Sequence, residues 1–255
     1  MAGTDGTTDW TRAGTAVPRT LLRDWVVCGL VAATTRFVPV PLLDDAVQGR
    51  AVRESVRRTL REAGRTYPVE TVAPLYERRG RGLLRTVAAA PLALALWPAR
   101  KWVRVAGAVR GVPTDLARVL ALGRCTYRVL ERGGLPDLPD GPDGIEAARH
   151  AVRTEAAQVR AAFDETIDEL DLRLVAAALQ DALGGARGLS GALVDYARGR
   201  FDRDRREHDA PGGLDPGEDV DRGVDRVLAA LRQPEVRRQV EELDRRLDER
   251  LAAPS

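Results

Sequence analysis

Apolar residues recur every three or four positions along much of this 255-residue chain, and this periodicity limits its fold more than any other feature. Such spacing places apolar side chains on one face of an α-helix. The pattern is clearest from Ile145 to Leu183, in the series Ile145, Ala148, Val152, Ala156, Val159, Phe163, Ile167, Leu170 and Leu174. Strict alternation of apolar and polar residues, the mark of a β-strand, is rare. We therefore predict an all-α protein, a multi-helix bundle with a long central helix in its C-terminal half.

Shorter periodic segments predict further helices on both sides of that long helix. Pro18 suits the first turn of one of them, and Pro39 and Pro41 form an extended corner that separates it from the next. The apolar stretch 83–105 is expected to bend at its prolines, and a new helix is expected to begin near Pro113. The expected helices cover residues 18–37, 43–63, 69–78, 113–132, 189–206 and 220–231, and continue from 234 onward.

Residues 133–144 contain so much proline and glycine that neither a helix nor a strand is expected there. The charge changes sign at the same place. Residues 1–134 hold 22 basic and 11 acidic side chains, whereas residues 135–255 hold 18 and 27. A basic half favours an anionic partner, although the acidic half could instead cover it. The predicted organisation is a disordered leader (1–17), a basic apolar-rich helical bundle (18–132), a Pro/Gly linker (133–144) and an acidic helical region with the long helix (145–253).

An uncharged run from Thr86 to Ala99 lies in the basic half. It is shorter than the roughly 20 apolar residues that a membrane-spanning helix needs. Basic and tryptophan side chains flank it, a combination typical of contact with a membrane surface. Each basic group near an anionic leaflet can contribute about 1 kcal/mol of binding free energy. The residues expected to meet a membrane are Arg78, Arg79, Arg81, Arg85, Trp97, Arg100, Lys101, Trp102 and Arg104.

Other interpretations of this run stay open. It could be an ordinary buried helix of a bundle, or a surface that binds a membrane protein or another protein partner, including a second copy of the chain. No nucleic-acid partner is expected, because no helix-turn-helix, RNA-binding motif or zinc finger is recognisable. The tryptophans also lie beside apolar runs rather than within a polar basic strip, where they could stack on bases.

Residues suited to catalysis or metal binding are few. Cys28 and Cys125 lie in apolar surroundings and are expected to be buried. His150 is expected to be exposed on the long helix, and it has no cysteine or histidine at ligand spacing. The carboxylates from Asp164 to Asp171 are expected to form a solvated acidic face or to dock onto the basic helices of the first half. We therefore expect no enzyme activity, no cofactor and no metal.

The segment 26–67 consists of an apolar helix, a corner with two prolines and two aspartates, and a basic amphipathic helix. In this it resembles the EcsC-like and YcjF-type bacterial families, over residues 20–130 at most. The residues that carry the resemblance are Pro39, Pro41, Asp44 and Asp45. The resemblance implies a helical, membrane-associated bacterial protein and carries over no catalytic residue. The arginine-rich second helix and the acidic C-terminal half depart from the family pattern.

Together these features predict a non-enzymatic, arginine-rich bacterial protein held peripherally on the inner membrane surface or on a membrane complex. Residues 1–17 contain no basic segment that leads into an apolar core, so a cytoplasmic location without a targeting signal is expected. The alternative is a soluble helical scaffold whose acidic half binds a partner or its own basic half.

Overall fold

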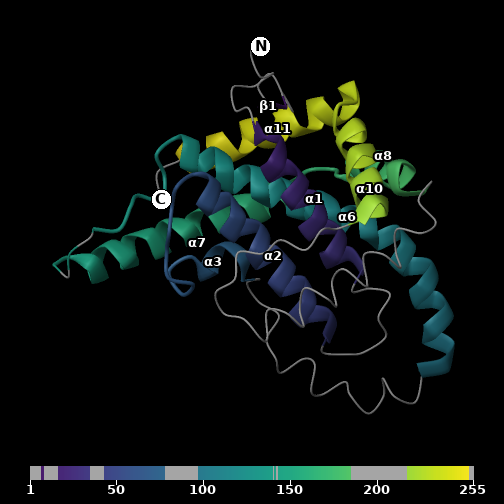
Figure 1. Cartoon of the computed structure of the whole chain (residues 1–255), viewed down its shortest axis with the longest axis horizontal. Coiled ribbons are helices and arrows are strands. Elements are labelled where there is room, and N and C mark those ends of the chain that lie inside the picture. The colour runs from purple at the N-terminus through teal and green to yellow at the C-terminus, as the bar shows by residue number, and fades with distance from the viewer. Residues whose placement is uncertain are drawn as a thin grey trace.

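The computed structural model describes residues 7–8, 17–34, 43–77, 97–139, 141, 143–184 and 217–252. Most of this part of the chain is helical, which confirms the predicted all-α multi-helix bundle (Figure 1). One antiparallel pair of two-residue strands, β1 (Thr7–Thr8) and β2 (Val17–Pro18), precedes the helices. Val17 is fully buried in the core; apart from Thr7, Thr8 and Val17, the residues of the expected leader lie outside the described residues.

Helices α1 (Arg19–Thr34) and α2 (Leu43–Glu62) pack against each other. α1 is buried along most of its length, because its sequence from Trp25 onward carries no charge. α2 is buried on one side, through residues such as Val56 and Leu60. Between the two helices, Trp25 Nε1 donates a hydrogen bond to Thr59 Oγ1 at 2.8 Å, which satisfies the indole donor inside the core. The proline corner expected between these helices lies outside the described residues.

The next helices differ from the expected bounds. α3 (Ala73–Tyr76) is a single turn, shorter than the helix expected at 69–78. α6 (Trp97–Glu131) runs for 35 residues with Pro113 inside it, so the prediction that a helix begins near Pro113 is wrong. A proline removes one N–H group and bends a helix, but it does not have to end it. From Leu116 to Leu130 every residue except Arg118 is buried, so this half of α6 is the centre of the bundle.

α6 ends at the paired glycines, as the sequence indicates. Gly133 adopts a φ of 82°, a conformation that glycine tolerates better than other residues. Its N–H donates to the Leu130 carbonyl, and the Gly134 N–H donates to the Val129 carbonyl, each at 2.9 Å. These bonds satisfy carbonyl groups at the end of the helix. The described part of the linker contains no helix, yet Leu135 within it is fully buried.

A long helix occupies the C-terminal half, but it ends earlier than expected. α7 spans Ile145–Glu169 and α8 spans Arg173–Gly184, so the single helix predicted from Ile145 to Leu183 is in fact two. Leu170 is extended, and Asp171 Oδ1 accepts a hydrogen bond from the N–H of Arg173, the first residue of α8, at 3.0 Å, which satisfies a donor that the helix leaves free. Leu174, which the periodicity placed on the buried face, is 55% exposed. The helix expected at 189–206 lies outside the described residues.

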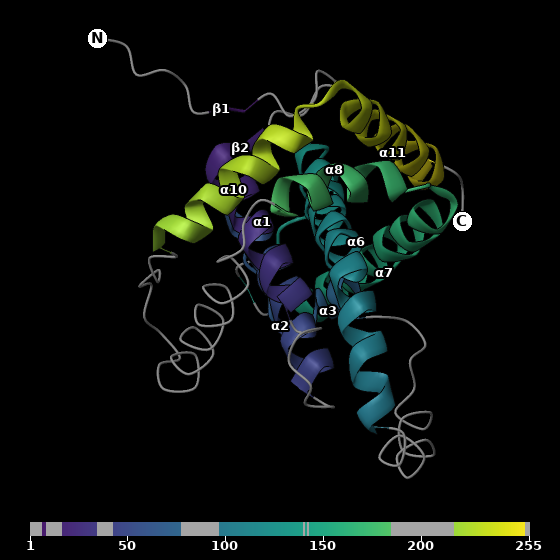
Figure 2. The same ribbon diagram turned by 90° about the vertical axis from the view of Figure 1, so that its right-hand side faces the viewer.

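α10 (Gly217–Leu231) and α11 (Pro234–Ala252) complete the fold. α10 packs on α8 and α1, whereas α11 lies along α7 and also contacts α8 and α6 (Figures 1 and 2). One large hydrophobic cluster joins α1 and α6 to α8, α10 and α11. The other joins α2, α3 and α6 to α7 and α11. Residues from both sides of the linker therefore share both of these cores.

Candidate functional site

The residues expected to meet a membrane lie in the first turns of α6 or before it. The five on α6 are Trp97, Arg100, Lys101, Trp102 and Arg104. The four that lie outside the described residues are Arg78, Arg79, Arg81 and Arg85. Figure 2 shows the first half of α6 extending away from the packed helices. The structure therefore places five of the nine residues on one helical segment that leaves the body of the molecule.

The other half of α6 is held by a buried ion pair that was not predicted. The side chain of Arg124 is fully buried, and that of Asp244 on α11 is 3% exposed. Arg124 Nε donates to Asp244 Oδ1 at 3.0 Å, and Arg124 Nη2 donates to Asp244 Oδ2 at 2.6 Å. Two parallel bonds of this kind also fix the orientation of the pair. Because an uncompensated buried charge is costly, the pair sets how α11 lies on α6.

Two more arginines continue the series at intervals of four residues, Arg128 on α6 and Arg132 one residue past its end. Arg128 Nη1 donates to Asp244 at 3.2 Å, and its Nη2 donates to Asp248 Oδ2 at 2.6 Å. Arg132, at the exposed end, donates from Nη2 to the same oxygen at 2.8 Å. Burial raises the pKa of Asp248, but the hydrogen bonds and positive charges of Arg128 and Arg132 outweigh it, so this pKa lies below its usual value. We call these five residues the arginine–aspartate row.

At its contact with α7, α11 supplies the arginines and α7 supplies the carboxylates, the reverse of the arginine–aspartate row. Arg250 Nη2 contacts Glu169 Oε1 at 2.6 Å, and Arg250 Nε contacts Glu165 at 3.4 Å. Arg246 lies 3.7 Å from Glu169. The hydrogen bond from Arg250 lowers the pKa of Glu169. These carboxylates belong to the acidic face that was expected to be solvated or to dock onto first-half helices. Both are exposed to solvent, and the helix that they contact is one of their own half.

The candidate nucleophiles and ligands are dispersed through the described part of the chain. Cys28 and Cys125 are unbridged and buried, as expected. Burial raises the pKa of the Cys125 thiol, which keeps it protonated and unreactive. His150 is exposed on α7. Among the described residues, no group of three or more His, Cys, Asp or Glu side chains is arranged to hold a metal ion.

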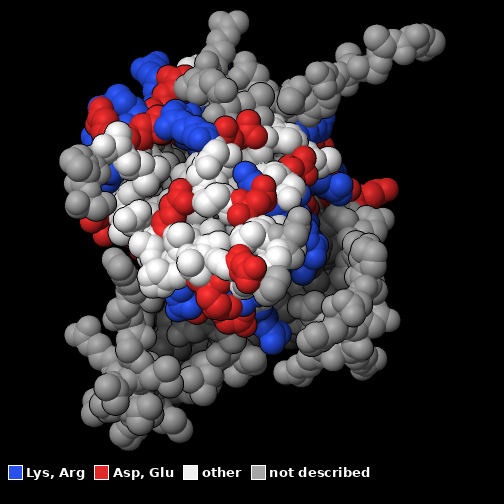
Figure 3. Space-filling view, turned by 90° about the vertical axis from the view of Figure 1, so that its left-hand side faces the viewer, with Lys and Arg blue, Asp and Glu red and all other residues white. Residues whose placement is uncertain are grey.

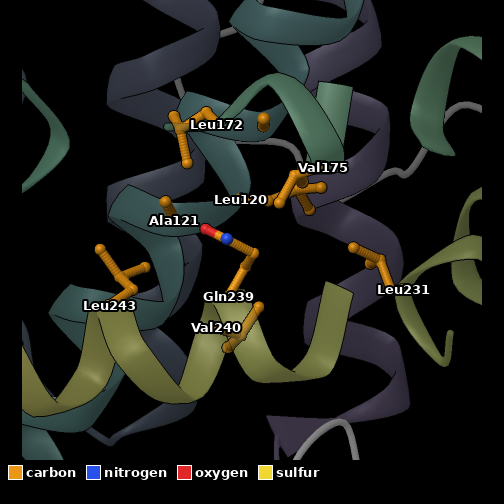
Figure 4. A pocket seen from close by; sticks show the side chains of 9 residues that line it. Leu120, Ala121, Leu172, Val175, Leu231, Gln239, Val240 and Leu243 are labelled. Carbon is orange, nitrogen blue, oxygen red and sulfur yellow. The ribbon is translucent and has the colours of Figure 1, made fainter. Parts of the chain in front are cut away.

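A small cavity lies where α11 faces α6 and α8 (Figure 4). Its volume is about 20 Å³. Gln239 is the one polar residue in its lining, and its amide points from α11 toward α6 (Figure 4). A space of this size holds a water molecule and is far below the several hundred cubic ångströms of a typical ligand pocket. This cavity therefore offers no room for a cofactor or substrate.

No family model, curated protein or solved structure matches the chain. The resemblance of residues 20–130 to the EcsC-like and YcjF-type families therefore stays a prediction. The arginine–aspartate row did have a signal in the sequence, since arginines at intervals of four on one predicted helix match aspartates four apart on another. That signal gains meaning only once α6 and α11 are known to be neighbours.

Proposed function

We propose that this protein binds peripherally to an anionic membrane surface through the first half of α6. That segment carries two tryptophans, which suit the membrane–water interface, and several basic residues, which attract anionic headgroups. The observation that carries the proposal is the continuity of α6. One helix joins the basic, tryptophan-containing segment to the centre of the bundle.

The packing of the rest of α6 supports this role, because a contact segment must be held firmly by the body. Around Gly123 the helix lies so close to Trp25 that an added Cβ atom would come within 2.6 Å of the indole ring. Arg124 is fixed by its buried pair with Asp244. The buried half of α6 thus acts as a rigid stem for the half that extends away from the other helices (Figure 2).

The distribution of charge also favours this segment. Residues 97–112 contain four basic residues and no acidic one. By contrast, acidic and basic side chains are interspersed over the face of the body that Figure 3 shows. A surface of mixed charge has little net attraction for an anionic leaflet, so a uniformly basic segment would decide the orientation of binding. None of the described helices is both long and apolar enough to span a bilayer.

Flotation with vesicles tests the proposal. The protein should float with phosphatidylcholine vesicles that contain phosphatidylglycerol, but not with phosphatidylcholine alone, and high salt should abolish binding. The variant Arg100→Glu/Lys101→Glu/Arg104→Glu should lose binding. The matched control Arg226→Glu/Arg232→Glu/Arg238→Glu, which reverses three exposed charges elsewhere, should keep it. Unchanged flotation of the α6 variant, or no flotation of the wild type, would contradict the proposal.

Ion pairs between the two halves favour a second candidate, a helical scaffold. Arg124 and Arg128 contact Asp244 and Asp248, so part of the acidic half already covers part of the basic half. In that case the start of α6 would bind an acidic protein surface instead of lipid. A wild type that stays with the unbound fraction under every lipid and salt condition would favour the scaffold.

A further inference from the structure

Four exposed arginines lie on the outer side of α2. Their spacing of three, four and four residues places them on one side of the helix. At 1.5 Å per residue the series is roughly 16 Å long. The opposite side of α2 is buried through Ser55 and Thr59, so the orientation of this series is fixed by the core. We call it the α2 arginine row, and its members are Arg50, Arg53, Arg57 and Arg61.

Few carboxylates lie in the stretch of α2 that carries the α2 arginine row. Glu54 is the one acidic residue between its ends, and it already accepts hydrogen bonds from Arg57 at 2.8 Å and Arg58 at 2.9 Å. Arg53 lies over the ring of Tyr76, with its Cζ 5.8 Å from the ring centroid. Within the described part of the chain, neither Arg53 nor Arg61 forms an ion pair with a carboxylate.

A general preference of this sequence for arginine over lysine does not explain the α2 arginine row, because on α11 the arginines stand next to glutamates that pair with them. Arg245 there contacts Glu242 at 2.7 Å and Glu249 at 2.5 Å, three and four residues away. Arg246 shares Glu242 at 2.6 Å. On α2, by contrast, arginines follow one another at the spacing where like charges destabilise a helix. Repulsion within the α2 arginine row therefore lowers the stability of the helix. Binding of an anionic partner gives a reason for the row to be present.

Lipid phosphate suits the row better than nucleic acid does. α2 contains no aromatic residue on which a base could stack. α2 and α6 are in contact, and both begin at the same end of the molecule in both ribbon views (Figures 1 and 2). A surface that meets the start of α6 therefore approaches α2 from its early turns, so Arg50 and Arg53 lie nearer to it than Arg61, which is in the last turn.

We propose that the α2 arginine row is a second membrane contact, in which its guanidinium groups bind the phosphate oxygens of anionic lipids. This inference rests on the proposed function, because α6 would bring the row to the same surface. A guanidinium group donates two parallel hydrogen bonds to a phosphate, a geometry that lysine does not offer. Arg53 contributes most, since it lies nearer the start of α2 than Arg61 does and no described carboxylate competes for it.

The test compares two glutamine variants in their partition onto phosphatidylcholine/phosphatidylglycerol vesicles. Arg53→Gln/Arg61→Gln removes two charges from the row. Arg226→Gln/Arg232→Gln removes two charges from exposed arginines in and just after α10, and serves as the control. The row variant should bind between about 5-fold and 30-fold more weakly than the control, because each basic group that reaches an anionic leaflet contributes about a factor of five. Circular dichroism should show equal helicity for both, since all four side chains are exposed.

The outcomes separate this inference from the proposed function. Equal binding by the row variant and its control overturns the inference, and the proposed function still stands if reversing the α6 charges abolishes binding. Weak binding by the row variant, together with normal binding by the charge-reversed α6 variant, supports the α2 arginine row as a membrane contact and overturns the proposal that α6 is one. A wild type that binds no vesicles, or binds duplex DNA in their place, overturns both.

Discussion

Arg124 is charged and fully buried, and Asp244 supplies the carboxylate that compensates it. In Asp244→Asn a neutral amide of nearly the same size replaces that carboxylate, so the buried guanidinium loses its counter-charge. We expect the free energy of unfolding to fall by about 3–5 kcal/mol. Urea unfolding followed by circular dichroism measures the change.

Two further variants test whether burial of the Arg124 charge causes the loss of stability expected in Asp244→Asn. Asp225→Asn removes an exposed pair with Arg19, whose side chains are 67% and 59% exposed, and should change stability by about 0.5 kcal/mol or less. Arg124→Met/Asp244→Met removes both buried charges and should be less harmful than Asp244→Asn alone. Equal losses in the exposed and the buried variants would contradict this explanation.

Two glycines should respond to alanine in opposite directions. A Cβ atom at Gly123 would lie 2.6 Å from the Trp25 ring, whereas one at Gly49 on α2 would meet nothing within 4 Å. Gly123→Ala should destabilise the protein by about 1–3 kcal/mol through overpacking. Gly49→Ala should stabilise it by up to about 1 kcal/mol, because alanine is the better helix former. Thermal unfolding of both variants measures this, and shifts of the same sign would refute the packing argument.

Hydrophobic periodicity predicted where the helices lie better than it predicted whether each helix is continuous. The bounds of α1, α2 and α10 lie within about three residues of expectation, because each has one continuous apolar face. The break between α7 and α8 was missed because Leu170 and Leu174 keep the helical spacing across it. The sequence places Asp171 in an acidic face, whereas its carboxylate accepts the N–H of Arg173, the first residue of α8. The sequence predicts a helix start at Pro113 because a proline inside a helix and one in the first turn look alike in sequence.

The contact between α6 and α11 should weaken in acid. The pKa of Asp248 is lowered in the folded protein, so as the pH falls the unfolded chain takes up a proton at this residue first. The stability that Asp248 contributes is therefore complete above about pH 4, the usual aspartate value, and is lost as the pH falls through the lower folded value.

The variant Asp248→Asn isolates this contribution. It should be about 1 kcal/mol less stable than the wild type at neutral pH, since the pair is only partly exposed. The difference should shrink as urea unfolding is repeated at successively lower pH. A difference that stays constant into strong acid would show that the charge of Asp248 contributes nothing.

Across the whole molecule, local patterns were predictable and long-range pairings were not. The basic segment at the start of α6 is contiguous in sequence, so composition alone located it. Arg124 and Asp244 stand 120 residues apart, and arginines or acidic residues at four-residue intervals occur on several helices. Which of them meet is decided by how the apolar faces pack. The change of charge at the linker likewise did not reveal that residues on both sides share two cores.

This shared packing predicts that the two halves unfold together. Both large clusters draw on residues before and after the linker, so neither is complete in one half. We expect a single urea transition, with far-ultraviolet circular dichroism coinciding with the near-ultraviolet signal of the edge-to-face pair Trp25 and Tyr127. Residues 1–139 expressed alone lack Asp244 and should show no cooperative transition. Two separate transitions, or a fragment with the native near-ultraviolet signal, would mean that the linker joins two independent domains.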